Sequence, residues 1–367
     1  MLTSKLAWRE LRRRPRAFVA PLGILVLLGV LLLYPAAVLD GIIHEATAAL
    51  SHAPADLVVY SRDANGVVIR SRIDPPLRAQ VEAVAGVEQA ATLDVVLLTG
   101  RVAGHDEPVP FAVFASDQPI GDVVPGAGEV IADGSLRSRA GMDDGSEAVV
   151  GPWDVPVRTI GFTDDINFWF GNGLVVDRAT WLALQGRAPP AGADPASDAS
   201  QALLVTIPDD AEPETVAAAI DEATGGATET FTRSGAVTAM PGVPQQQATF
   251  GAIRMVTLGV ALLVVGLYLS FVLLERGPLY AVLKAVGASS RQLFGTLLTQ
   301  VTAIADISML IATLIAWGIT RLPLGIPARL QFESVFATAM ALRTVAAIAA
   351  AWSLRRVVRV DPAEALG

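Results

Sequence analysis

The segment AFVAPLGILVLLGVLLLYPAAVL, residues 17–39, decides the fold, because it contains no charged residue. A helix of about 20 apolar residues crosses the hydrocarbon layer of a bilayer. Arg16 precedes the segment and Asp40 follows it. Since basic residues gather on the cytoplasmic side of a membrane, we expect a span that begins inside and ends outside. A cleaved signal peptide is the alternative, but its apolar core is usually shorter.

Three later segments have the same character, so the sequence predicts four membrane spans. A short cytoplasmic loop is expected after the second span and an extracytoplasmic loop after the third. The alternation of leucine with lysine and arginine before the first span indicates an amphipathic helix at the cytoplasmic interface, with a disordered basic leader as the alternative. The predicted order is interfacial helix 1–16, span 17–39, domain 40–248, span 249–274, loop 275–292, span 293–320, loop 321–334, span 335–355 and tail 356–367.

The charges divide the chain in the same way. Residues 40–248 hold 30 of the 36 acidic residues but only 11 of the 27 basic ones. Translocated domains escape the bias toward basic residues that marks cytoplasmic loops. We therefore expect a multi-pass protein of the plasma or inner cell membrane, with both termini in the cytoplasm. A net charge of −9 argues against nucleic acid as a partner, and the absence of cysteine excludes disulfides.

Residues 40–248 alternate short β-type runs with two amphipathic helical stretches. Residues 56–60 and 67–69 are predicted as strands and residues 77–84 as a helix, and the strand, helix, strand order returns over residues 203–232. Residues 128–184, rich in glycine and aspartate, suit a small β insertion. The predicted fold is thus an α+β membrane protein with four transmembrane helices and one large extracytoplasmic domain.

Catalytic motifs are missing from this domain. The sequence contains no GxSxG or HExxH motif, and its three histidines lack metal-ligand spacing, so we predict neither an enzyme nor a metal site. The aspartate pairs, Asp164-Asp165 among them, are typical of solvated turns. His44 and Glu45 lie just past the first span, where a lipophilic ligand leaving the bilayer could meet them. Phe168-Trp169-Phe170 is interpreted as core packing, with a ligand platform or a membrane-facing edge as alternatives.

The loop ERGPLYAVLKAVGAS, residues 275–289, carries the most specific local pattern. Pro278 suits the first turn of a helix, and Gly287 suits its end. Leu279 and Leu283, four residues apart, lie on one apolar face. A short amphipathic helix at the cytoplasmic face of the membrane would need a protein groove or lipid to cover that face.

With this loop, the tail VDPAEAL (residues 360–366) and the order of spans, the chain resembles the MacB/FtsX-like permeases of ABC transporters, in outline the stand-alone DevC-like exporter permeases. The resemblance implies a porter-like outside domain and a homodimer paired with two copies of an ATPase. It also implies that the loop is a coupling helix that docks on the ATPase. The residues assigned to this contact are Glu275, Arg276, Leu279, Leu283, Lys284, Gly287 and Ala288.

The sequence contains no GxxxxGK[ST] motif, so we expect ATP and Mg to bind to a separate P-loop ATPase and this chain to carry no cofactor. The resemblance implies mechanotransmission: ATP-driven motion of the helices moves the outside domain and exports or extracts a lipophilic substrate such as a lipid, haem, a peptide or a drug. The alternative is an FtsX-like regulator that activates an extracytoplasmic cell-wall hydrolase.

Two ionisable residues lie at mid-span. Asp306 is near the middle of the third predicted span and Arg343 near the middle of the fourth. Such residues usually face protein or water and find a partner. Their matched depth in consecutive antiparallel helices predicts that they pair. The alternative is that the spans are displaced by several residues and the charges reach the interface.

Overall fold

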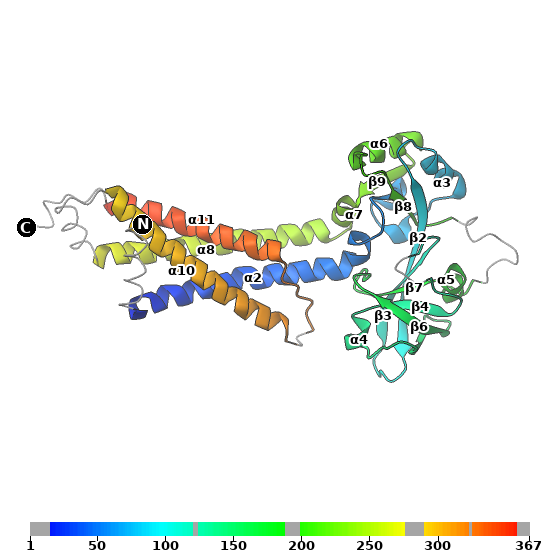
Figure 1. Ribbon diagram of the computed structural model, residues 1–367, viewed down its shortest axis with the longest axis horizontal. Coiled ribbons are helices and arrows are strands. Elements are labelled where there is room, and N and C mark those ends of the chain that lie inside the picture. Colours follow the sequence, from blue (N-terminus) through cyan, green and yellow to red (C-terminus); the bar gives the residue numbers. More distant parts are fainter. Residues whose placement is uncertain (1–14, 120–123, 188–198, 276–289, 323–324, 358–367) are drawn as a thin grey trace, which may run out of the picture. The chain divides into compact units, whose positions relative to one another are not determined.

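Four long helices carry the apolar segments of the chain (Figure 1). The computed structural model describes residues 15–119, 124–187, 199–275, 290–322 and 325–357. By length and composition, each of the four helices could cross a membrane. All four are longer than the predicted spans, and the first continues well past Leu39. They are α2 (Pro15–Ser51), α8 (Val243–Glu275), α10 (Ser290–Thr320) and α11 (Phe332–Val357).

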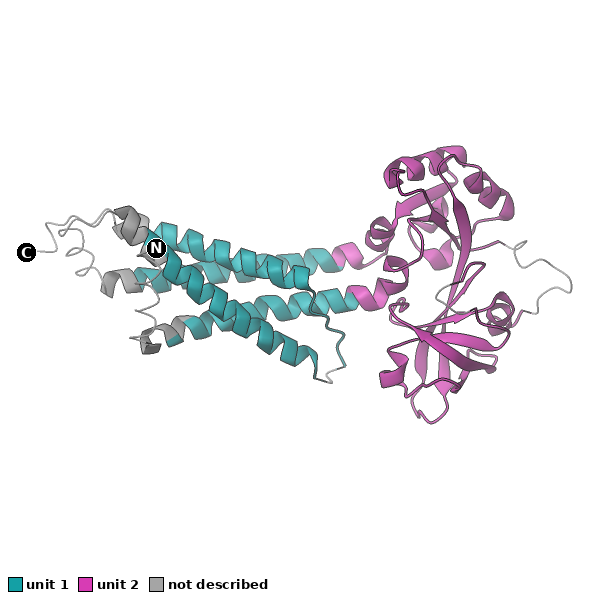
Figure 2. Ribbon diagram, in the orientation of Figure 1, with its two compact units in different colours: residues 1–42, 246–367 teal, residues 43–245 magenta. Residues whose placement is uncertain are grey.

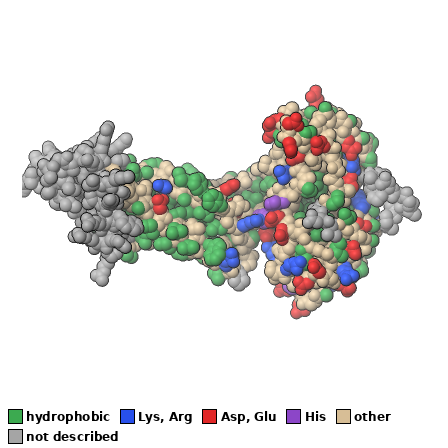
Figure 3. Space-filling view, in the orientation of Figure 1, with side chains coloured by type: hydrophobic (Ala, Val, Ile, Leu, Met, Phe, Trp, Pro, Cys, Tyr) green, Lys and Arg blue, Asp and Glu red, His purple; other side chains and the backbone are tan. Residues whose placement is uncertain are grey.

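The chain divides into two compact units (Figure 2). Unit 1 comprises the described parts of residues 1–42 and 246–367, and unit 2 comprises residues 43–245. Apolar side chains dominate the visible described surface of unit 1, whereas most of the charged side chains in view are on unit 2 (Figure 3). The predicted class, an α+β protein with four apolar helices and one large domain, is confirmed.

Leucine, valine and alanine from all four helices form the main core of unit 1. Helices α2 and α10 also approach closely where small residues face each other. A Cβ atom added to Gly29 would lie 2.7 Å from the Cβ of Ala312, which is fully buried. Small residues at such crossings let helix backbones come close, which favours helix association inside a bilayer.

Unit 2 begins with an open four-stranded sheet, in the order β2-β8-β1-β9. Both faces of this sheet are covered, and alternate residues of its strands point to opposite faces. Leu57 and Val59 pack under α3 and α6, whereas Val58 and Tyr60 pack against α7 and the end of α2. The elements are β1 (Leu57–Ser61), β2 (Gln89–Val102), β8 (Ala202–Thr206), β9 (Thr228–Thr232), α3 (Pro75–Glu82), α6 (Pro213–Ala223) and α7 (Arg233–Ala239).

A closed six-stranded barrel adjoins this sheet and shares β2 with it (Figure 1). The pairings run β2-β3-β7-β4-β6-β5 and return to β2, so the ring has no open edge. The remaining elements are β3 (Val109–Ser116), β4 (Glu129–Asp133), β5 (Glu147–Val150), β6 (Val155–Thr163), β7 (Asn172–Val176), α4 (Leu136–Arg139) and α5 (Arg178–Leu184).

Strand β2 serves both parts because it is 14 residues long. Its first five residues pair with β8, and its last three residues pair with β5. Asp94 lies between these two stretches. Its carboxylate accepts hydrogen bonds from Arg178 of α5 and from the Gln201 amide before β8. Burial raises the pKa of Asp94, although the Arg178 charge acts in the opposite direction.

Two details of the predicted domain differ from the structure. Residues 67–69 do not form a strand. The chain instead forms two short 3₁₀-helices, Arg62–Ala64 and Val68–Arg70. Between them, Asn65 (φ +50°) and Gly66 (φ +73°) adopt left-handed conformations that reverse the chain direction. The β structure expected over 128–184 is also only part of a barrel. It closes through β3 and the distal part of β2, which precede that range in the sequence.

The close approach at Gly29 yields a testable prediction for the bundle. Gly29→Ala should lower the melting temperature of the detergent-solubilised protein, because the new methyl group overlaps Ala312 and overpacking costs about 1–3 kcal/mol. Gly23→Ala on the same helix is the control, since its added Cβ atom meets nothing within 4 Å. Equal melting temperatures for the two variants would contradict this packing.

Candidate functional site

The predicted ATPase-contact loop lies mostly outside the described residues. Glu275 is the last residue of α8, and α10 begins at Ser290. The other residues assigned to this contact (Arg276, Leu279, Leu283, Lys284, Gly287 and Ala288) fall within the undescribed range 276–289. Their role as a coupling helix therefore remains a prediction. The interfacial helix expected over residues 1–16 falls almost entirely outside the description too.

The mid-span pair lies within unit 1. Arg343 Nη1 is 3.6 Å from Asp306 Oδ1, so α10 and α11 present the two charges to each other. Each side chain is about half exposed, at 51% for Arg343 and 53% for Asp306. The pair therefore lies on the outer surface of the described bundle rather than in its core. At this depth only lipid, water or another protein chain could cover it.

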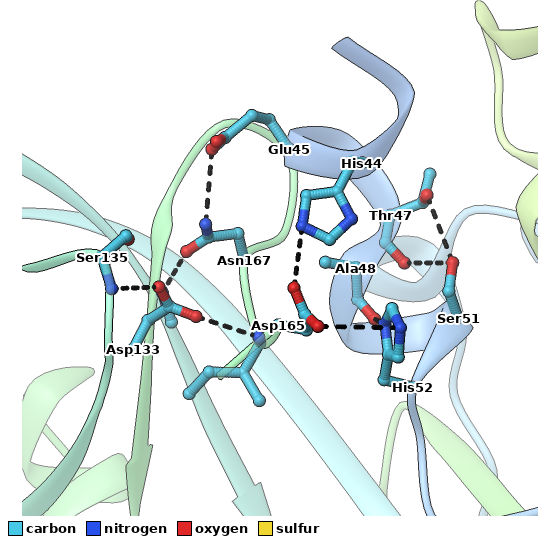
Figure 4. Close-up of polar contacts among 12 residues, drawn as sticks. His44, Glu45, Thr47, Ala48, Ser51, His52, Asp133, Ser135, Asp165 and Asn167 are labelled. Carbon is cyan, nitrogen blue, oxygen red and sulfur yellow. Dashed lines mark hydrogen bonds and ion pairs between the residues drawn. The ribbon is translucent and has the colours of Figure 1, made fainter. Parts of the chain in front are cut away.

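His44 lies beside an acidic side chain of unit 2. Its Nε2 lies 3.0 Å from Asp165 Oδ1. The other oxygen of Asp165 is 3.8 Å from Nε2 of His52, one helical turn past Ala48 (Figure 4). The prediction that Asp165 is a solvated turn residue is therefore wrong. The same carboxylate faces two histidines of α2.

Glu45 forms a bidentate ion pair with an arginine of the barrel region. Arg139 of α4 binds its two carboxylate oxygens at 2.5 and 3.0 Å, in the bidentate geometry that favours arginine–carboxylate pairs. These hydrogen bonds raise the pKa of Arg139. Asn167 donates a further bond to Glu45 at 3.4 Å (Figure 4), and Asn172 accepts one from Arg139 at 3.2 Å.

The loop of residues 164–171 also bonds directly to the backbone of α2. The Asn167 carbonyl accepts from the Ala49 amide at 3.0 Å, and the Trp169 and Phe170 amides donate to carbonyls of Ala46 and Glu45 at 3.0 and 3.2 Å. Backbone groups of Glu45, Ala46 and Ala49 thus each bond to the loop. The loop is attached to the backbone of the last turns of α2 at three points.

This loop is held in an unusual conformation. Asp165, Trp169 and Phe170 have φ angles of +61°, +48° and +63°, in the left-handed region that bulky residues rarely adopt. Such conformations persist where surrounding contacts determine them. One such contact is Phe168, which is 2% exposed and packs in the same core as Leu50 of α2. We name α2 residues 43–52, loop 164–171, Arg139 and Asn172 the helix–loop joint.

Sequence reasoning found only part of this joint. It singled out His44 and Glu45 for their position after the first span, but it missed Arg139, Asn167 and Asn172. No local pattern marks these residues, because they come within reach only when the barrel closes. The core interpretation of the aromatic triplet is right for Phe168 and wrong for its two neighbours, which are 36% and 49% exposed.

The joint holds α2 against the barrel through hydrogen bonds, ion pairs and apolar packing. Within the described ranges, no group of three or more histidine and acidic side chains could hold a metal ion. A cleft of about 290 Å³ lies beside α3 and contains an arginine. This arginine already has partners within the protein. Arg78 in that cleft already binds Glu82, Asp117 and the Ala90 carbonyl at 2.7 to 2.9 Å.

Fold and composition together define the class of this protein. Four membrane-capable helices, with a sheet-and-barrel domain between the first and the second, make it a multi-pass membrane protein. The C-terminal region is similar to a known family. Residues 252–362 match the family model described as FtsX-like permease C-terminal. This match includes the loop and part of the tail on which the predicted resemblance rests, and it confirms that prediction.

Two solved structures are similar to part of the chain. The periplasmic region of MacB from Actinobacillus actinomycetemcomitans has 11% sequence identity and a TM-score of 0.35, covering 49% of this chain and 90% of that one. The extracellular domain of the ABC-type transporter YknZ from Gram-positive bacteria has 13% identity and a TM-score of 0.33, covering 48% and 99%. These scores are too low to assign a function to this chain.

The mid-span pair yields a double-mutant prediction. Arg343→Ala should lower the melting temperature in lipid nanodiscs more than the double change with Asp306→Ala, because the single change leaves a carboxylate without its partner at bilayer depth. Arg321→Ala, at the end of α10, serves as a control for the loss of a positive charge. If the two single losses simply add in the double variant, the side chains do not interact.

Proposed function

We propose that this chain is the transmembrane permease subunit of an ABC exporter of the mechanotransmitting kind. A separate P-loop ATPase would bind ATP and Mg, and the chain itself would carry no catalytic group. The family match over residues 252–362 supports the permease class. The observation that carries the mechanical part is the helix–loop joint, in which the end of α2 is bonded to the barrel through backbone and side chains.

Helix α2 is the mechanical element of this proposal. It is one continuous helix from Pro15 to Ser51, and its last turns belong to unit 2. An α-helix is stiff along its axis because every interior residue is hydrogen-bonded. Movement of α2 would therefore reach loop 164–171 and, through Arg139, the barrel. Helix α8 would act on the open sheet instead, because α7 links α8 to β9.

Assembly with the ATPase follows from the same proposal. Two copies of the chain would pair with two ATPase subunits, which dock on the loop of residues 275–292 at the cytoplasmic face. Both termini would then lie in the cytoplasm and unit 2 outside the cell membrane. Binding and hydrolysis of ATP would rock the helices and move unit 2. The cargo would be a lipophilic molecule that unit 2 extracts or expels without passage through the helix bundle.

The coupling loop provides the test. Leu283→Asp places a charge on the apolar face of the predicted coupling helix. ATP hydrolysis by the ATPase that copurifies from native membranes in mild detergent should fall to the level of the isolated ATPase. Leu322→Asp is the matched control, because this exposed leucine follows the other end of α10. It should leave ATP hydrolysis unchanged.

Three outcomes would count against the proposal. Copurification of no P-loop ATPase would remove the ABC assignment, and full stimulation in Leu283→Asp would remove the docking role of the loop. Recovery of an ATPase together with a cell-wall hydrolase and no bound lipophile would favour the regulatory alternative. Monodisperse Leu283→Asp protein on gel filtration is required, so that loss of coupling is distinguished from loss of folding.

A further inference from the structure

Two aromatic side chains are exposed beside the end of α2. Trp169 is 36% exposed and Phe170 is 49% exposed, although Phe168 beside them is buried. Their backbone is fixed, because both amides donate to carbonyls of α2 and both residues adopt left-handed conformations. The exposure is therefore a constant feature of a well-held loop. A strained backbone that presents two large apolar side chains points to a binding surface.

The position along α2 of the carbonyls that bind Trp169 and Phe170 indicates what covers these two side chains. The carbonyls of Glu45 and Ala46, which bind the two amides, come two and three residues after Ile43. Ile43 is the last apolar residue before His44. At a rise of 1.5 Å per residue, Ala46 lies about 5 Å beyond Ile43 and about 10 Å beyond Leu39 along the helix. The headgroup layer on each side of a bilayer is about 5 to 7 Å deep.

We propose that Trp169 and Phe170 bind the lipid headgroup layer on the side of the membrane that unit 2 occupies. Tryptophan concentrates at this level, because its ring is apolar and its N–H is polar. The nearby polar groups are compatible with headgroups, since Arg139 and His52 are each about half exposed. The contact would restrain the barrel at the membrane surface. It requires membrane insertion of α2 but does not depend on the ATPase assignment.

The absence of cysteine from the natural sequence makes a direct depth measurement possible. Trp169→Cys and Phe170→Cys would each carry a nitroxide spin label in the full chain, reconstituted in vesicles of phosphatidylethanolamine and phosphatidylglycerol. Trp153→Cys is the matched control. This tryptophan of unit 2 is 64% exposed and lies between β5 and β6, in a part of the barrel that the joint does not include.

We expect the ratio of relaxation by lipid-soluble oxygen to relaxation by a water-soluble nickel chelate to be higher at 169 and 170 than at 153, because the headgroup layer holds more oxygen and less chelate than bulk water. The same ratio at all three positions would overturn the proposal. Labels at 169 and 170 that are shielded from both reagents would also overturn it, because they would indicate coverage by protein rather than lipid.

A second measurement keeps an aromatic residue at position 169 and so avoids the introduction of cysteine. The fluorescence that Trp169→Tyr removes from the chain should be smaller in vesicles with brominated acyl chains than in unbrominated vesicles, because bromine quenches a tryptophan that it reaches. The fluorescence that Trp153→Tyr removes should be the same in both kinds of vesicle. Equal losses for Trp169→Tyr in the two kinds of vesicle would contradict lipid contact at Trp169.

Discussion

The length of α2 is the constraint on which the rest of the structure depends. Inside a bilayer every backbone polar group must be bonded internally, so the chain crosses as a helix. A helix of 37 residues is about 55 Å long, whereas the hydrocarbon layer is about 30 Å thick. The helix must therefore continue into polar surroundings, where its last turns can contact unit 2. The helix–loop joint supplies them through three backbone hydrogen bonds and the pair of Glu45 with Arg139.

The architecture of unit 2 determines to which part each helix is attached. Strand β2 belongs both to the open sheet and to the closed barrel, and Asp94 bonds to groups from both parts where they diverge. Helix α2 is bonded to the barrel through loop 164–171 and Arg139. Helix α8 continues from α7, which follows β9 of the sheet. In the proposed function, a displacement of α2 relative to α8 would thus exert different forces on the barrel and on the open sheet.

The sequence predicts the membrane architecture well, because lipid imposes a simple rule on length and apolarity that a single helix can satisfy. It also predicts that Asp306 and Arg343 lie at matching depths. It does not predict the barrel, because β3 and the distal half of β2 acquire their role only through pairing with distant strands. Arg139 and Asn167 are likewise ordinary surface residues in the sequence. Their significance comes from a left-handed loop whose bulky residues, Trp169 and Phe170, give no local signal for that conformation.

The most direct test of the central claim is a distance measurement across unit 2 during the ATPase cycle. Gln80→Cys on α3 reports the sheet and Ser138→Cys on α4 reports the barrel, and both positions are exposed. Pulsed electron resonance would measure their separation in the complex with its copurified ATPase, with and without ATP. The account predicts a change in this distance that is lost when Glu45→Ala and Asn167→Ala weaken the joint. The same change with a weakened joint, or no change in either protein, would contradict transmission through α2.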